Sequence, residues 1–240
     1  MLTQAEKSPL AVSAARRLPS FPLTVDTVIL TILEGELKVV LVKRLDEPFA
    51  GLWALPGGFV HEKESLESAA RRELREATGA QDVYLEQLYT FGEPQRDTRG
   101  RVVSVAYVAL VAADRCPLTP HRLEAEARWF SVYELPAMAF DHREMLDTAL
   151  SRVRTKLEYT TLGFQLMPAT FTLKELQSSY EIVLHRSLDK RNFRRRLKLL
   201  DLIEAVGEKR ADGPGRPAML YRFKDVNFLH LREKGFYLPF

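Results

Sequence analysis

With 240 residues, the chain is long enough for one large domain or two modest ones, and its 46% hydrophobic and 28% charged residues are typical of a globular protein. A single cysteine, Cys116, excludes an internal disulfide and favours a reducing, cytoplasmic location. No apolar run reaches the roughly 18 residues that a membrane-spanning helix needs, so we expect no membrane partner.

The net charge of +3 is unevenly distributed along the chain. Residues 161–240 carry 15 Lys and Arg against 9 Asp and Glu, whereas residues 1–160 carry 20 against 23. This asymmetry predicts two domains, of which the second binds an anionic partner.

The first part of the chain alternates strands with helices. Residues 1–20 lack the apolar core of a signal peptide, and we expect an N-terminal tail or arm. Residues 24–33 and 37–42 predict two strands joined as a hairpin, because both are rich in β-branched and apolar side chains. Further strands are expected at residues 83–91, from Val102 onward and at 127–131, and an amphipathic helix at 141–156. This order predicts an α/β fold, a mixed sheet in a sandwich with helices.

The stretch from residue 55 to residue 80 is the most informative. Gly57 and Gly58 predict a tight turn at which the backbone comes close to a ligand. A helix is expected to begin at Ser65 and to end before Gly79, the residue type that helix C-termini prefer.

Carboxylates line one side of this helix. Glu73 and Glu76 are three residues apart and therefore project from the same side. Together with Glu64 they could hold Mg²⁺, a cation that prefers carboxylate and phosphate oxygens. Arg72 would add charge-assisted hydrogen bonds to a pyrophosphate. A solvated, charged helix face is the alternative interpretation.

The spacing of these residues resembles the Nudix box of nucleoside-diphosphate-X hydrolases. After the first glycine come five residues and a glutamate, seven residues and Arg-Glu-Leu, one residue and a glutamate, then two residues and a glycine. The matching residues are Gly58, Glu64, Arg72, Glu73, Leu74, Glu76 and Gly79. Ala77 and Ala80 depart from the pattern, since the family has a second glutamate and a larger apolar residue at these positions. The missing glutamate helps bind the catalytic metal in the family, so the resemblance implies the fold more firmly than it implies hydrolysis.

An arginine-rich loop follows the next predicted strand. Arg96, Arg99 and Arg101 lie within residues 95–101, and we expect this loop on the same side of the sheet as the Nudix-like helix. From Arg96 into residues 102–107 the sequence is similar to the ADP-ribose-related Nudix branch. A solvated hairpin loop is the alternative.

The second part of the chain begins after a linker near residues 160–170. Thr172 and Glu175 form the capping box of a new helix. A turn at residues 185–187 separates it from a second helix, which begins at about Asp189.

The second helix has one apolar face and one basic face, and this pattern predicts a helix-turn-helix whose second helix enters the DNA major groove. Strands at residues 202–206 and 219–223 enclose a glycine-rich basic tip at 207–217, which predicts a wing. The candidates for base contacts are Arg191, Asn192 and Arg195. The candidates for backbone contacts are Lys190, Arg194, Lys209, Arg210 and Arg216. A solvated charged helix and an oligomerisation module are the alternatives.

A Nudix-like domain followed by a winged helix is similar to the NrtR family of Nudix-related transcriptional regulators of NAD metabolism. Residues 171–177, 188–195 and 213–218 carry the second half of this resemblance. It implies an effector-binding and dimerisation domain over residues 21–158 and a winged helix-turn-helix over residues 159–240. It also implies a homodimeric repressor of NAD-metabolism genes that binds double-stranded DNA at a palindromic operator and senses ADP-ribose or a related sugar nucleotide.

The resemblance also predicts where the effector binds. ADP-ribose is expected over Gly58 and the face formed by Glu73 and Glu76, with Arg72, Arg99 and Arg101 near its pyrophosphate. The alternative is a Mg²⁺-dependent ADP-ribose pyrophosphatase with an accessory C-terminal domain, in which Glu124 or Glu126 replaces the lost metal ligand.

Overall fold

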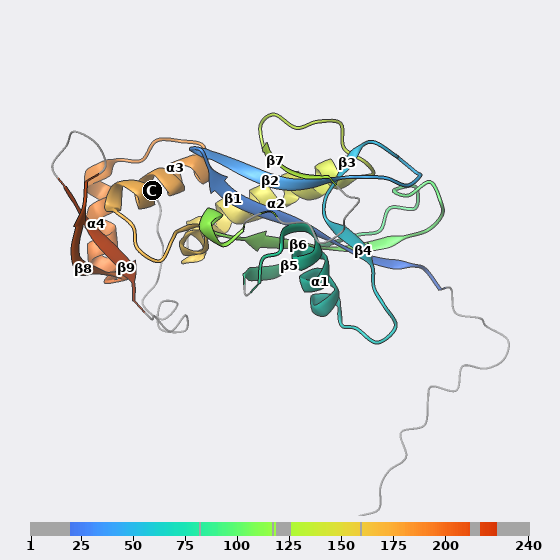
Figure 1. Ribbon diagram of the computed structural model, residues 1–240, viewed down its shortest axis with the longest axis horizontal. Helices are drawn as coiled ribbons and strands as arrows, with labels where there is room; N and C mark the ends of the chain where they lie inside the picture. Colours follow the sequence, from blue (N-terminus) through green and yellow to red (C-terminus); the bar gives the residue numbers. More distant parts are fainter. Residues whose placement is uncertain are drawn as a thin grey trace, which may run out of the picture.

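The structure, a computed structural model, describes residues 20–81, 83–116, 118, 126–158, 160–211 and 217–224. Residues 1–19 of the predicted tail, Glu124 and Arg216 lie outside these residues. The described chain forms a seven-stranded mixed sheet with its helices, followed by a smaller unit with a two-stranded sheet (Figure 1). None of its helices is long and apolar enough to cross a membrane.

The large sheet has the order β3-β2-β1-β6-β5, and two short strands extend it, β4 beside β1 and β7 beside β2. Its strands are β1 (Leu23–Leu33), β2 (Glu36–Lys43), β3 (Trp53–Ala54), β4 (Gly57–Phe59), β5 (Tyr84–Phe91), β6 (Val103–Leu110) and β7 (Ala127–Ser131). The predicted hairpin of β1 and β2 is confirmed, with Leu30 opposite Val39. β1 and β6 run parallel, with Val25 beside Val105, whereas the other pairs are antiparallel.

Two helices cover opposite faces of this sheet because side chains of β1 alternate between the faces. Val25 packs with Ala69 and Ala70 of α1 (Leu66–Thr78). Val28 and Leu30 belong to the larger core that includes Met145 and Val153 of α2 (His142–Leu157). The predicted α/β sandwich with a mixed sheet is therefore confirmed.

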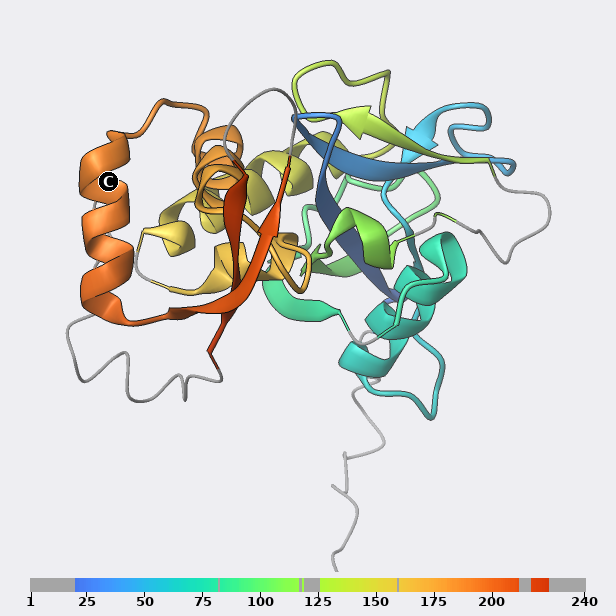
Figure 2. The same cartoon turned by 60° about the vertical axis from the view of Figure 1, so that its left-hand side comes forward.

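The smaller unit contains two α-helices separated by a short turn, and a β-hairpin. Its elements are the 3-10 helix η2 (Leu162–Leu166), α3 (Leu173–Leu184), α4 (Lys190–Leu200), β8 (Ile203–Arg210) and β9 (Ala218–Phe223). Thr172 and Glu175 make the predicted capping box, and Asp189 accepts a hydrogen bond from the Asn192 amide as the N-cap of α4. Figure 1 places α4, β8 and β9 together at one end of the molecule, and Figure 2 shows α4 at the edge away from α1.

One hydrophobic core continues through both units. Leu157 of α2, Leu162 of η2 and Phe171 are buried together with Leu176 and Tyr180 of α3. The linker near residues 160–170 is therefore a packed segment, because η2 places Leu162 and Leu166 in this core. α3 consequently rests directly on α2.

Two strands differ in length from their sequence patterns. The apolar stretch from Val102 to Ala113 suggested one long strand, but β6 ends at Leu110, and a 3-10 turn, η1 (Ala113–Arg115), follows it. β8 runs on to Arg210, so the wing tip is shorter than expected. β8 can continue because Gly207, at a φ of +86°, accommodates a register shift between Ala205 and Lys209.

Candidate functional site

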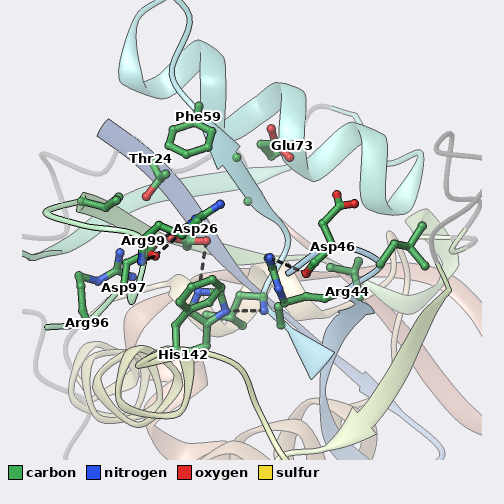
Figure 3. A pocket seen from close by; sticks show the side chains of 18 of the residues that line it. Thr24, Asp26, Arg44, Asp46, Phe59, Glu73, Arg96, Asp97, Arg99 and His142 are labelled. Atoms are coloured by element: carbon green, nitrogen blue, oxygen red, sulfur yellow. Dashed lines mark hydrogen bonds and ion pairs between the residues drawn. The ribbon is translucent and has the colours of Figure 1, made fainter. Parts of the chain in front are cut away.

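A pocket of about 800 Å³ opens between the N-terminal half of β1, β4, α1 and the loops that contain Arg44, His61, Arg99 and Phe140 (Figure 3). This volume lies in the range of small-molecule sites. β1 contributes Thr24 and Asp26, and α1 contributes Arg72 and Glu73. The remaining lining includes Arg44 and Asp46 after β2, Gly57, Gly58 and Phe59 of β4, His61, Arg96, Asp97, Arg99, Phe140 and His142.

The two glycines of β4 are required for space. Neither has a positive φ, so the predicted tight turn was wrong: both residues lie in a strand paired with β1. A Cβ on Gly57 would collide with the carboxylate of Asp26, whose Cγ would lie 2.9 Å away. A Cβ on Gly58 would collide with the carboxylate of Glu73, whose Cδ would lie 2.8 Å away. The glycines thus allow two acidic side chains to press against the β4 backbone.

Arg72 links carboxylates of the Nudix-like motif, one before α1 and one on it. Its guanidinium donates to Glu64 at 2.7 Å and to Glu73 at 2.5 Å, and Glu76 lies 3.8 Å away. Its Nη2 also donates to the Phe59 carbonyl at 3.2 Å. The hydrogen bonds from Arg72, followed by that from the His61 amide, lower the pKa of Glu64 to about 2.

The predicted Mg²⁺ ligands do not fit a metal ion in this arrangement. No three His, Cys, Asp or Glu side chains within the described ranges are grouped so that they could hold a metal. Oxygens of Glu64 and Glu73 accept hydrogen bonds from Arg72, and Ala77 is buried in the core, where it supplies no oxygen. Glu64 and Glu76 also do not line the pocket, whereas Glu73 does.

The floor of the pocket is a buried acid beside a buried histidine. Asp26 accepts a hydrogen bond from the Ser104 hydroxyl, and its Oδ1 lies 3.5 Å from Nε2 of His142. Nδ1 of His142 accepts from the Leu55 amide at 2.9 Å, so the ring proton belongs on Nε2, facing the acid. Burial lowers the pKa of His142 although the Asp26 charge opposes this shift. The floor therefore offers an acceptor, Asp26, next to the Thr24 hydroxyl, which is buried without a hydrogen-bond partner among the described residues.

The three arginines of the loop between β5 and β6 are placed differently from one another. Arg96 forms a two-bond ion pair with Asp141 through Nε and Nη2, at 2.8 and 2.7 Å. Arg99 lines the pocket and binds Asp97, and its guanidinium carbon lies 5.7 Å from the Phe59 ring centroid. Arg101 does not line the pocket: it is exposed and stacks on Phe21.

The basic face of α4 is exposed. Phe193 and Leu197 point into the core, and the charges lie on the other side of the helix. The exposed side chains are Lys190, Arg191, Arg194, Arg195 and Lys198. Asn192 is half-buried and accepts hydrogen bonds from Arg195 at 3.0 Å and from Arg196 at 3.3 Å. This side of α4 can contact a polyanion without unfolding any part of the core.

Two of the residues predicted to contact DNA from the wing differ in how accessible they are. Lys209 is exposed at the end of β8, whereas Arg210 forms an ion pair with Glu175 at the start of α3. This ion pair fastens the wing to the helix-turn-helix, and a phosphate would have to compete with Glu175 for Arg210.

Comparison with known proteins decides the family. Residues 22–149 match the NUDIX domain family, and residues 163–223 match the family described as the NrtR DNA-binding winged helix domain. The "ADPR responsive transcriptional repressor NtrR" of Acinetobacter baylyi is 38% identical over 223 residues, which cover 90% of this chain and 88% of the relative. The chain belongs to the NrtR family.

Solved structures agree with this assignment. Shewanella oneidensis NrtR in complex with a 27mer DNA is 40% identical, with a TM-score of 0.76, over 84% of this chain and 93% of that chain. The Nudix domain of the same protein in complex with ADP ribose is 38% identical, with a TM-score of 0.54, over 62% and 99% of the two chains. An ADP-ribose pyrophosphatase of Methanocaldococcus jannaschii is 37% identical over 115 residues, which cover 48% of this chain and 67% of the relative.

In this NrtR-family chain, the motif-based prediction missed the residues that reach the pocket from elsewhere. Asp26, Arg44, Phe140 and His142 all line it, and none belongs to the Nudix-like motif. Asp26 carried a usable signal, because an acid inside an otherwise apolar strand must find partners when the strand is buried. Arg44 follows β2 directly, but its orientation toward the pocket depends on how the loop that contains Pro48 folds back.

Proposed function

We propose that the protein is a DNA-binding transcriptional repressor whose Nudix domain binds ADP-ribose and thereby changes the affinity for DNA. The observation that carries this proposal is that one chain combines the 800 Å³ pocket with the exposed basic face of α4. The relative from Acinetobacter baylyi, named as an ADPR-responsive repressor, supports the combination over 90% of this chain.

The Nudix domain is proposed as a sensor because its carboxylates are poorly arranged for metal-assisted hydrolysis. Ala77 takes the place of a family glutamate, and Arg72 holds Glu64 and Glu73. ADP-ribose is then bound without being hydrolysed, and the intact molecule acts as the signal. The pocket residues Gly58, Arg72, Glu73 and Arg99 are the proposed contacts from the sequence-predicted set.

The DNA-bound form is proposed to be a homodimer on a palindromic operator upstream of NAD-metabolism genes, in the cytoplasm. Two α4 helices would then read half-sites about one helical turn apart. The effector domain is proposed to cover residues 21–158 and the winged helix residues 159–240. The ligand acts only if the DNA-competent and DNA-incompetent dimers differ in their affinity for it.

The second candidate function is an ADP-ribose pyrophosphatase, which the similarity to the Methanocaldococcus jannaschii enzyme supports. Glu73 remains at the pocket in this reading. Release of AMP in the presence of Mg²⁺, abolished by Glu73→Gln, is its expected signature.

One experiment separates the two functions. The protein is titrated onto its own upstream promoter DNA with and without ADP-ribose and Mg²⁺ in a mobility-shift assay, while AMP is followed by chromatography. A specific complex that intact ADP-ribose alters supports the sensor. Rapid AMP formation without a specific complex would instead establish the hydrolase.

A further inference from the structure

Arg44 is a half-buried cation that forms no ion pair with any of the described residues. Its Nε donates to the Pro48 carbonyl at 2.9 Å and its Nη2 donates to the Asp46 carbonyl at 3.1 Å. No carboxylate of the described residues lies within the 4.0 Å of an ion pair with Arg44, although the charges of Asp46, Asp97 and Asp26 act on it from farther away. Such a guanidinium retains donors and charge for a ligand.

Phe140 holds Arg44 close to a second guanidinium. The guanidinium carbon of Arg44 lies 4.8 Å from the Phe140 ring centroid, and that of Arg99 lies 5.8 Å from the same centroid. Figure 3 shows Arg99 and Arg44 on either side of Asp26, with both side chains at the pocket. Burial, and after it the charge of Arg99, lowers the pKa of Arg44. The charges of Asp46, Asp97 and Asp26 raise this pKa in part, and an anionic ligand near both guanidinium groups would further offset the repulsion between them.

The other cations that line the pocket already have acidic partners. Arg96 binds Asp141 at 2.7 Å, and Lys43 lies 3.5 Å from Glu126. Arg72 is held by Glu64, which precedes α1, and by Glu73 of α1, and Arg99 pairs with Asp97 at 2.7 Å. An anion entering the pocket would have to displace a carboxylate from each of these side chains, whereas Arg44 needs no such exchange.

We infer that Arg44 and Arg99, supported by Phe140, form a clamp for the pyrophosphate of the effector. This inference rests on the proposed function and makes it more specific, because it selects ligands with two linked phosphates. It moves the phosphate contacts away from Arg101, which stacks on Phe21 outside the pocket, and it adds a residue that the motif does not contain.

The test is calorimetric titration of the full chain with ADP-ribose. Arg44→Ala should weaken binding by about tenfold or more, because a hydrogen-bonded charge pair is lost. Arg44→Lys should fall between Ala and the wild type, since it keeps the charge and loses the planar fork. The matched control is Arg101→Ala, which removes an arginine outside the pocket and should bind ADP-ribose as the wild type does. Thermal unfolding of each variant verifies that it is folded.

A double-mutant cycle tests the pairing itself. If both arginines bind one pyrophosphate, the losses caused by Arg44→Ala and Arg99→Ala should not add in the double variant. Additive losses would separate Arg99 from the clamp and overturn it. Binding of ADP-ribose by Arg44→Ala within about twofold of the wild type would also overturn the clamp and leave the proposed function standing.

Failure of the proposed function has a different signature. A wild type that does not bind ADP-ribose overturns the effector, and inorganic pyrophosphate then tests the clamp alone. A rise in melting temperature with pyrophosphate that Arg44→Ala abolishes would keep the anion site. An equal rise in both proteins, or none in either, would overturn it.

Discussion

Arg154 of α2 donates a hydrogen bond from Nε to the main-chain oxygen of Val183 in α3, at 3.0 Å. Its Nη2 donates to the hydroxyl of Tyr133, whose ring lies 4.5 Å from that of His185 at the end of α3. The same helix α2 begins at His142 on the pocket floor. One continuous helix therefore contacts both the pocket and the helix-turn-helix.

We expect Arg154→Ala to weaken the response of DNA binding to ADP-ribose. The variant should still bind ADP-ribose and DNA separately, because Arg154 belongs to neither surface. The ratio of DNA dissociation constants with and without ADP-ribose should fall by about threefold or more, the size of effect seen for residues between coupled sites. Arg143→Ala is the control, since Arg143 is exposed on the same helix and pairs only with Asp147 among the described residues. An unchanged ratio in Arg154→Ala would exclude this contact from the coupling.

Arg194→Ala should weaken binding to all DNA sequences similarly. Arg194 is exposed on α4, and a phosphate contact carries no sequence information. The slope of log affinity against log salt should become shallower by about one unit, as expected when one phosphate contact is lost. The slope is measured by fluorescence anisotropy with operator and unrelated DNA. Arg71→Ala, at an exposed position of α1, should leave the slope unaltered. A loss confined to the operator would assign Arg194 to base recognition.

Gly58→Ala should destabilise the fold by about 1–3 kcal/mol, the usual range for overpacking. The added Cβ meets the Glu73 carboxylate, and either β4 or α1 must shift. Gly92→Ala is a matched control, because the nearest atom to its Cβ would be Cγ2 of Val103 at 3.9 Å. Urea denaturation measures both. Similar midpoints for the two variants would contradict the contact with Glu73.

Stability should decrease below pH 6.5 because of His142. Burial holds its folded pKa below the ordinary value of 6.5, so the unfolded chain binds more protons in this range. The free energy of unfolding then falls as the pH falls, by at most about 1.4 kcal/mol for each pH unit. Asp26, Asp141, Arg96 and Arg44 surround the ring and are the groups whose charges modify this loss.

His142→Asn isolates the contribution of this side chain. Melting temperatures are compared at pH 7.5 and 5.5 for the variant and the wild type. The variant should lose less stability between these pH values than the wild type does. Equal losses would assign the acid sensitivity to other groups.

Local signals predicted much of the fold. The helix start expected at Ser65 and the capping box expected at Thr172 are both present, and both side chains accept capping hydrogen bonds. These interactions involve residues three apart, so they can be read directly from the chain. The sequence placed Gly207 in the wing tip, whereas it lies within β8. Its position in the strand depends on the register between β8 and β9, which the whole hairpin determines.

The sequence predicted only those residues of the candidate site that lie close together in the chain. Arg72 and Glu73 are neighbours on one helix, and the Nudix-like spacing identifies both. Asp26 and His142 meet across 116 residues of sequence, through the packing of α2 under the sheet. Arg44 and Arg99 meet at Phe140, a third segment. Contacts of this kind follow from the tertiary fold and carry no periodic signal.

The hydrophobic core that passes from α2 through η2 into α3 limits how this protein can be rebuilt for other uses. A chimera that joins the Nudix domain to the DNA-binding domain of another protein at residues 160–170 would expose Leu157. Such a fusion should aggregate, as should a winged helix cut away from α2, which would expose Tyr180. A transplant that carries α2 and the winged helix together keeps their shared surface covered. Engineered biosensors based on this chain should therefore exchange the pocket loops and leave the scaffold whole.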